Sequence, residues 1–145
     1  SSEAPYGKMI MGNLEPFFVE KRYENLIDFN LTMIEWLRGK FGIITPIYFS
    51  SKLNVDSHTS SELILEICKR LNTETYLCGD SGKEYLNLKE FEETGVNVEW
   101  QDFQHPKYNQ VGEKFISHLS SLDFIFNYGP DSEEAFNEII IGKKQ

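Results

Sequence analysis

Apolar residues recur at helical spacing in two stretches of the first half of the chain. Across residues 23–37 they return every three or four positions, and Gly39 and Gly42 follow where a helix can end. A second apolar stripe covers residues 63–71. It comes directly after residues 59–62 (TSSE), a capping-box sequence in which a hydroxyl and a carboxylate bind the first free amides of a helix. This pattern predicts one helix in each stretch.

Three short runs of β-branched and aromatic residues predict strands: "IITPIYFSS" at 43–51, "TETYLC" at 73–78 and "VNVEWQDF" at 96–103. A short helix is predicted between the last two, at 87–95. Because strands that alternate with helices pair in parallel through crossovers, the order predicts an α/β fold with a Rossmann-like parallel sheet of about three strands and flanking helices. Pro46 argues against a central position for the first strand, since proline cannot donate to the ladder.

The two ends of the chain carry contrasting signals. Residues 1–20 contain two prolines and two glycines among scattered aromatic residues, which predicts an irregular segment that packs against something else. Helical spacing returns at residues 115–126, and Pro130 occupies a position typical of the first turn of a last helix that runs to Ile141. We therefore predict a single α/β domain over residues 1–145 with a helical C-terminus.

Composition and charge restrict the class of protein. The 145 residues are 40% hydrophobic and carry 23 acidic against 14 basic residues, a formal net charge of −9. This excess of negative charge argues against nucleic acid as a partner, because binding to phosphate backbones needs clustered cations. No run approaches the ~18 consecutive apolar residues of a membrane-spanning helix. We expect a soluble protein without a membrane span.

Cysteine and histidine usage indicates no metal centre. Cys68 and Cys78 lie in apolar stretches without a CxxC pairing, as expected of reduced, buried thiols in a cytoplasmic protein. The three histidines, His58, His105 and His118, show no metal-ligand spacing. The sequence predicts no metal site and identifies no cofactor.

The stretch "YLCGDSGKEYL", at 76–86, comes directly after a predicted strand, where α/β proteins collect ligands. It is not a P-loop, since a P-loop has four residues between its glycines and a hydroxyl after its lysine. Two interpretations remain open: a plain turn, or a loop that contacts a ligand of another kind. In the second interpretation the substrate-binding residues are Gly79, Ser81, Gly82, Lys83 and Tyr85.

A second group of polar residues follows the last predicted strand, in "WQDFQHPKYNQ". It brings together Asp102, His105, Lys107, Tyr108 and Gln110. A histidine in such company supplies a group that titrates near neutral pH, as acid–base chemistry requires. One interpretation makes His105 a general base oriented by Asp102, with Tyr108 and Gln110 holding substrate. In the other interpretation His105 is a structural histidine.

Two further polar groups have structural interpretations. In one interpretation the serines and Asp123 within residues 117–129 are capping groups near a helix start, and in the other Asp123 faces a site. The acidic residues Glu90, Glu92 and Glu93 are typical of a solvated helix face.

Taken in order, several stretches resemble the WbqC-like family. The most distinctive are the elements G-x-x-G-K-x-Y-L and F-x-H-P-x-Y-x-Q. The stretches that carry the resemblance are "YGK" at 6–8, "LIDFNLTMIEWL" at 26–37, "SSKLNV" at 50–55, "TYLCGDSGKEYL" at 75–86, "GVNVEWQDFQHPKYNQ" at 95–110 and "FISHLSSLDFIFNYG" at 115–129. They cover most of the chain. The family's N-terminal segment with its His-Gln-Pro motif has no counterpart, so the chain resembles the C-terminal portion of such a protein.

The resemblance implies a bacterial protein of polysaccharide and O-antigen biosynthesis. We expect a transferase that moves an acyl or aminoacyl group onto an amino sugar carried by a nucleotide, with the 79–86 loop and the 102–110 cluster lining one pocket. The expected partners are a nucleotide-sugar or other small-molecule substrate, together with an N-terminal half or a second copy of the chain. The alternative is a non-catalytic binding or assembly module of a polysaccharide biosynthesis complex.

Overall fold

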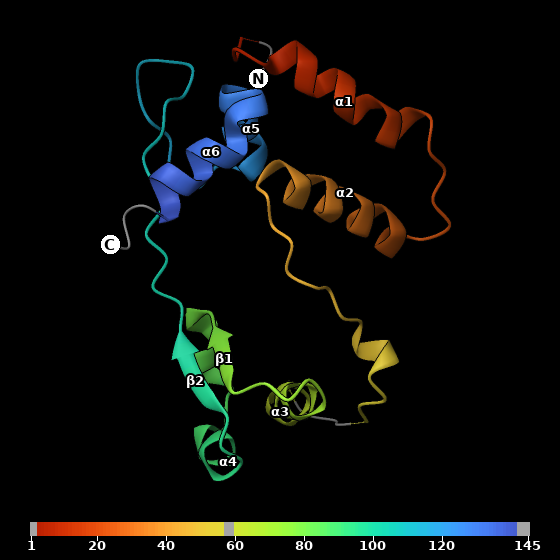
Figure 1. Cartoon of the computed structure of the whole chain (residues 1–145), viewed down its shortest axis with the longest axis vertical. Helices are drawn as coiled ribbons and strands as arrows, with labels where there is room; N and C mark the ends of the chain where they lie inside the picture. The colour runs from red at the N-terminus through yellow and green to blue at the C-terminus, as the bar shows by residue number, and fades with distance from the viewer. Residues whose placement is uncertain (1–2, 57–59, 142–145) are drawn as a thin grey trace. The chain divides into compact units, whose positions relative to one another are not determined.

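The computed structural model describes residues 3–56 and 60–141 (Figure 1). The chain divides into two compact units, and each is described by itself. Unit 1 is formed by Ser1–Thr45 and His105–Gln145, and unit 2 by Pro46–Gln104. The described residues are mostly helical, with one small parallel sheet in unit 2.

All the secondary-structure elements described in unit 1 are helical. Its elements are α1 (Gly7–Val19), α2 (Leu26–Lys40), α5 (Ser121–Tyr128), a 3-10 turn (Gly129–Asp131), α6 (Ser132–Phe136) and a π turn (Asn137–Ile141). The last three form a continuous helical stretch with Pro130 in its first turn, which confirms the predicted helical C-terminus. Figure 1 shows α1 and α2 at the red and orange end of the colour bar and α5 and α6 in blue.

The prediction of an irregular segment at 1–20 is wrong, because α1 occupies most of it. Pro16 lies inside the helix, in its last turn, where it removes the hydrogen bond that an N–H at this position would make to the carbonyl of Gly12. Ile10 and Leu14 are one turn apart and buried, and they share a core with Ile125 of α5. Full burial of such a side chain is worth about 1.5–3 kcal/mol, which offsets the proline and glycine in this helix. The predicted packing of the segment against the rest is confirmed.

Helix α2 confirms the first helical prediction. Its start is fixed by Asn25, whose side-chain oxygen accepts a hydrogen bond of 3.1 Å from the amide of Asp28. It ends before Gly42, which has a φ of +64°, a conformation that favours glycine. None of its residues is fully buried, although Met33 and Trp36 pack on the unit 1 core.

Helix α5 begins later than predicted. The apolar residues Phe115 and Ile116 lie in a loop, and the helix starts at Ser121 after its N-cap Ser120. The loop is not helical because His118 has a φ of +60°, which a right-handed helix cannot contain. Helical spacing alone did not reveal this interruption.

Unit 2 contains the sheet. Its elements are a 3-10 turn (Ser50–Lys52), α3 (Ser60–Arg70), β1 (Thr75–Cys78), a 3-10 turn (Asp80–Glu84), α4 (Leu88–Glu93) and β2 (Asn97–Trp100). The predicted helices at 63–71 and 87–95 are confirmed as α3 and α4, while Thr59 of the predicted capping box lies outside the described residues. The strands pair in parallel, with Thr75 opposite Asn97 and Cys78 opposite Trp100.

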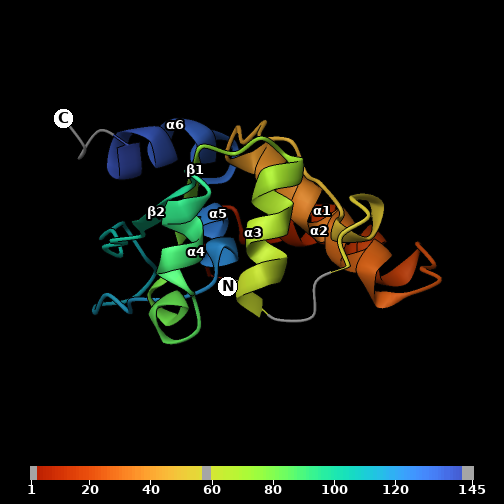
Figure 2. The same ribbon diagram turned by 90° about the horizontal axis from the view of Figure 1, so that it is seen from below.

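The core of unit 2 lies between the sheet and two helices. Helices α3 and α4 lie side by side (Figure 2). Leu65 and Cys68 of α3 meet Phe91 of α4, and Tyr76 and Val98 on one face of the sheet pack against them. A hydrogen bond of 2.9 Å from the amide of Asn87 to Oγ of Ser61 joins the two helices near the start of each.

The strand predicted at 43–51 is not formed. Residues 43–49 are extended without strand pairing, and the 3-10 turn at Ser50–Lys52 follows them. Pro46 removes a backbone donor from this segment, and Ile44 is 93% exposed, so the segment lacks the burial that supports a strand. The described residues 3–56 and 60–141 therefore hold two strands, a parallel pair that does not by itself make a Rossmann-like sheet.

Candidate functional site

The loop that follows β1 is a tight 3-10 turn, and its two glycines have different surroundings. Gly82 is buried, and a Cβ atom there would collide with Sγ of Cys78. Gly79 has an ordinary φ of −72°, and a Cβ atom there would meet open space. Gly82 is therefore required for packing of the loop on its own strand, whereas neither space nor backbone conformation requires Gly79.

Lys83 already has a partner within the same turn. Its Nζ lies 2.8 Å from Oδ1 of Asp80 and 5.4 Å from the centroid of the Trp100 ring. The two charged side chains are 56% and 80% exposed, and pairs this exposed are worth about 0–1 kcal/mol. An anion that approached Lys83 would displace the carboxylate of Asp80 at little cost.

Ser81 and Tyr85 complete this loop at the surface, where both are exposed. Behind them, burial raises the pKa of Tyr76 to about 12, and a hydrogen bond to Cys78 contributes in the same direction. Burial also raises the pKa of the Cys68 thiol. The core behind the loop therefore stays uncharged at neutral pH, and the loop's polar groups face solvent.

The second predicted cluster is organised around a residue of α5. Oη of Tyr108 donates a hydrogen bond of 2.9 Å to Oδ2 of Asp123, and Nε2 of Gln110 donates one of 3.1 Å to the same oxygen. Burial is the main reason why the pKa of Tyr108 is raised, and its bond to Asp123 raises it further. Tyr108 therefore remains a protonated donor, and it fixes the 105–110 segment on α5.

Gln110 also closes the loop in front of α5. Its Nε2 donates to the carbonyl oxygen of Ile116 at 2.9 Å, and its Oε1 accepts from the amide of Ile116 at 2.8 Å. The Gln110 side chain thus pairs with both backbone groups of Ile116, as a residue on a neighbouring β-strand would. Tyr108 and Gln110 act here as structural contacts, and their predicted contact with substrate stays a prediction.

His105 is half-buried among aromatic rings. Its ring centroid lies 6.1 Å from that of Tyr108, 6.0 Å from that of Phe115 and 4.7 Å from that of His118. Nδ1 of His105 is shielded from solvent, whereas His118 is exposed. The fold therefore places two imidazoles together at the surface of unit 1.

Sequence reasoning missed the parts that Asp123 and His118 play in this cluster. For Asp123 it favoured helix capping over a place in a site. Ser120, one of the predicted capping serines, is the cap, and its Oγ accepts from the amide of Leu122 at 3.3 Å. Ser120, three positions earlier, is a preferred capping residue, and its presence was the signal that Asp123 is not needed as the cap. Nothing in the spacing of His105 and His118 predicted their approach, since it depends on the loop closed by Gln110.

Asp102 is exposed, and its Oδ1 accepts a hydrogen bond of 2.9 Å from Nε2 of Gln104. The predicted orienting action of Asp102 on His105 stays a prediction. The same holds for a shared pocket, because the 79–86 loop belongs to unit 2 and His105, Tyr108 and Gln110 belong to unit 1.

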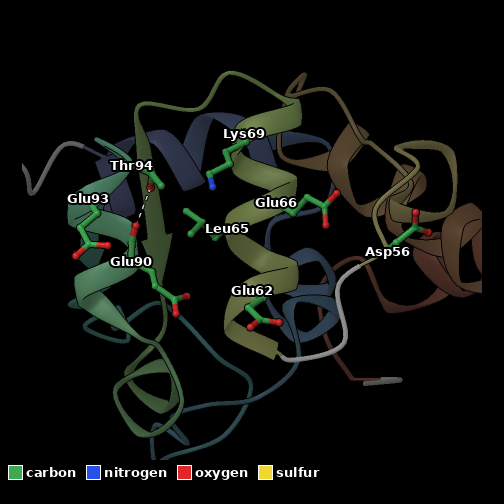
Figure 3. Close-up of a pocket in the computed structure, with 8 residues that line it drawn as sticks. All are labelled: Asp56, Glu62, Leu65, Glu66, Lys69, Glu90, Glu93 and Thr94. Atoms are coloured by element: carbon green, nitrogen blue, oxygen red, sulfur yellow. Dashed lines mark hydrogen bonds between the residues drawn. The ribbon is translucent and has the colours of Figure 1, made fainter.

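An open hollow of about 540 Å³ lies over α3 and α4 (Figure 3). Its lining holds five carboxylates and one amine, together with Leu65 and Thr94. The carboxylates are those of Asp56, Glu62, Glu66, Glu90 and Glu93, and the amine is that of Lys69. Nη2 of Arg70 lies 3.7 Å from Oε1 of Glu66, and Nζ of Lys89 lies 3.7 Å from Oε1 of Glu93. These cations next to the hollow balance part of its negative charge. The Thr94 hydroxyl is bound within its own helix, to the carbonyl of Glu90. These features fit the predicted solvated helix face.

Two absences apply to the described part of the chain, residues 3–56 and 60–141. No three histidine, cysteine, aspartate or glutamate side chains within it are grouped as metal ligands would be. No helix within it has the length and apolar character needed to cross a bilayer.

Comparison with known proteins supplies the family. No solved structure matches the chain. A curated relative, Uncharacterized protein Rv1507c of Mycobacterium tuberculosis, is 25% identical over 122 residues, which are 83% of this chain and 52% of the relative. The chain thus spans about half the length of the curated relative it matches. The WbqC-like protein family matches residues 1–135, nearly the whole sequence, and the chain belongs to this family.

Proposed function

We propose that the chain is part of a bacterial transferase of polysaccharide or O-antigen biosynthesis, which moves an acyl or aminoacyl group onto an amino sugar linked to a nucleotide. Membership of the WbqC-like family supports the setting. The half-length match to the relative supports the view that further residues, in a longer protein or in a second copy, complete the enzyme. The free cysteines, both buried, suit a cytoplasmic location.

The observation that carries this proposal is the half-buried, supported position of the His105 imidazole. Its imidazole is half-buried beside Tyr108 and Phe115, on a segment that the bond from Tyr108 to Asp123 holds in place. A general base must keep a defined position relative to the proton that it removes. Here His105 takes the proton of the sugar's amino group as the nitrogen attacks the acyl carbon, and Asp102 orients the imidazole.

The loop of unit 2 binds the nucleotide part of the substrate. Lys83 exchanges Asp80 for an oxygen of the substrate's pyrophosphate, which carries two negative charges and offers several acceptors. The exposed ring of Tyr85 stacks on the base, while Gly79 and Ser81 provide backbone and hydroxyl contacts. Gly82 supports the loop from beneath, and Tyr108 and Gln110 contact substrate through the lone pairs that Oη of Tyr108 and Oε1 of Gln110 retain beside their bonds to Asp123 and Ile116.

The sheet is the part of the fold that this proposal completes. Parallel sheets occur almost only with helices on both faces, and a lone pair of short strands is marginal. Leu77 of β1 is 60% exposed. We propose that β1 and β2 belong to a Rossmann-like sheet whose other strands come from the rest of the longer protein. A structure of that protein with β1 and β2 still unaccompanied would contradict this.

Thermal-shift measurements test the substrate class. UDP-glucosamine is titrated into this chain and into the longer protein. The variants Lys83→Ala and His105→Ala are measured beside the wild type. We expect stabilisation of at least one of the two proteins, weakened by Lys83→Ala. No stabilisation of either protein would count against a nucleotide-sugar substrate, and turnover unchanged by His105→Ala would remove the proposed base.

The second candidate function is a non-catalytic binding or assembly module. It is favoured by apolar side chains that stay exposed on α1 and α2, among them Phe18 at 63% and Leu26 at 72%. Ile27 and Ile34 add an exposed stripe along α2. Surfaces of this kind mark protein contacts. Stable association of the chain with the remaining half or with itself, together with no response to UDP-glucosamine, would favour this function.

A further inference from the structure

Two imidazoles from different segments meet in unit 1. The ring centroids of His105 and His118 lie 4.7 Å apart, with 37° between the ring planes. The residues are thirteen positions apart, and the loop between them turns back through the two hydrogen bonds of Gln110 with Ile116. The pair is thus held by the fold and does not depend on local sequence.

Packing alone does not account for His118. The residue is exposed, so burial of its ring does not explain where it lies. Its φ of +60° is a conformation that residues other than glycine seldom adopt, although asparagine, aspartate and histidine tolerate it best. Backbone strain of this kind concentrates at functional sites, where the surrounding structure enforces it. Here that structure is the Gln110 contact on one side and the N-cap of α5 on the other.

The two rings differ in their access to solvent. His105 is half-buried with its Nδ1 shielded, and His118 is exposed beside it. Tyr108 and Phe115 are the other rings against His105. The charged group next to Tyr108 is the carboxylate of Asp123, which accepts a hydrogen bond from the Tyr108 hydroxyl. Tyr128, which lies on α5 with Asp123, has its ring centroid 6.5 Å from that of Tyr108. The pair therefore offers one fixed and one accessible proton-transfer group on a supported surface.

We propose that His118 is the second acid–base group of the transfer reaction, acting as general acid where His105 acts as general base. The inference rests on the proposed function. With a carboxylic ester as donor, the amino nitrogen forms a bond to the acyl carbon, and the bond from that carbon to the leaving oxygen breaks. His105 takes the proton that the nitrogen loses, and protonated His118 gives a proton to the leaving oxygen. The neighbouring rings then exchange the proton, so atoms and charge balance.

The experiment compares two acetyl esters that differ in how much their leaving groups need a proton. The longer protein, and the 145-residue chain beside it, are each given UDP-glucosamine with p-nitrophenyl acetate or with phenyl acetate, and N-acetylated product is measured by mass spectrometry. p-Nitrophenolate leaves without protonation more readily than phenolate does. His118→Gly and His118→Asn remove the imidazole, and both residues tolerate a positive φ, so the loop keeps its backbone.

With phenyl acetate, we expect both His118 variants to lower the rate by about 100-fold or more, since general acid catalysis is typically worth 10²–10⁴. With p-nitrophenyl acetate, they should change the rate little. Added imidazole should restore phenyl acetate turnover to His118→Gly, which a purely structural role would not allow. Leu119→Ala, a neighbouring exposed side chain, is the control and should behave as the wild type with both esters.

The outcomes separate this inference from the function on which it rests. Equal losses with both esters, or no rescue by imidazole, overturn the role of His118 as an acid and leave His105 untouched. Transfer that His105→Asn does not reduce overturns the proposed base. If neither the wild-type longer protein nor the wild-type chain transfers from either ester, the proposed function fails and the role of His118 fails with it.

Discussion

The two loops singled out by the sequence have opposite relations to the fold. In unit 2 the loop after β1 has its most distinctive residues explained by packing and pairing: Gly82 makes room for Cys78, and Lys83 binds Asp80. In unit 1 the loop before α5 is held by Tyr108, Gln110 and Asp123, and this support leaves an imidazole pair at the surface.

The difference shows that a glycine and a lysine in a loop are weak signs of a ligand site until their neighbours are known. A buried glycine can serve only the chain around it, and an exposed ion pair contributes little in either direction. In the unit 1 loop, His118 has a strained backbone, and the partly buried hydroxyl of Tyr108 binds the carboxylate of Asp123. Such features are a stronger indication of function.

Gly82→Ala should have the largest effect on stability. The added Cβ would collide with Sγ of Cys78 and press on Trp100, and such overpacking typically costs about 1–3 kcal/mol. We expect a loss of about 2 kcal/mol in the free energy of unfolding of unit 2. Urea denaturation in a Trp36→Phe background, followed by the fluorescence of Trp100, measures it.

Gly79→Ala is the matched control. Its Cβ would meet open space at an ordinary φ, so its effect should stay within about 0.5 kcal/mol of zero. Similar losses in the two variants would show that the packing explanation of the loop is wrong.

Tyr108→Phe should have a smaller effect, in unit 1. The change removes the hydrogen bond to Asp123 but leaves the one from Gln110. The loss of one such bond should cost about 1–2 kcal/mol. Trp36, which packs on the unit 1 core, is the fluorescent reporter in a Trp100→Phe background. An unchanged midpoint would mean that Asp123 does not hold the 105–110 segment.

A third prediction concerns the pH dependence of the stability of unit 2, where Tyr76 lies behind the loop. Burial raises the pKa of Tyr76 from 10.0 to about 12. Between these values the phenol ionises in the unfolded chain but not in the folded one, so the stability of unit 2 falls as pH rises through this window. Below pH 10 the effect is absent. Tyr76→Phe removes the group.

Thermal melts at pH 9, 10 and 11 measure this effect through Trp100. The wild type should lose more of its melting temperature between pH 10 and 11 than Tyr76→Phe does. Equal slopes for the two proteins would show that Tyr76 is not shielded from solvent behind the loop.

The sequence predicted those parts of the fold that local patterns determine. Helix α2 has a helical stripe with Asn25 before it and Gly42 after it, and the parallel pairing of β1 and β2 follows from the helix between them. It failed where distant contacts outweigh propensity. Helix α1 forms despite Pro16 because Ile10 and Leu14 are buried against α5, and the segment with Ile44 stays unpaired because nothing covers it.

The candidate site followed the same rule. His105, Tyr108 and Gln110 were recognised as a polar group on one loop, and in the structure Tyr108 and Gln110 donate hydrogen bonds to the same oxygen of Asp123. Their common partner, Asp123, belongs to a helix fifteen residues further on, and the sequence contained no signal of that bond. The approach of His118 likewise depends on a loop closed by a side chain.

The most direct test of the account is the turnover of two variants measured side by side, one in each loop. With UDP-glucosamine and p-nitrophenyl acetate, His105→Asn should lower kcat by about 100-fold or more, because the base is lost. Lys83→Ala should raise KM for the nucleotide sugar and leave kcat nearly unchanged, since it removes binding that substrate and transition state share. A wild-type kcat in His105→Asn, with the loss of kcat in Lys83→Ala instead, would place the chemistry in the loop of unit 2 and contradict the account.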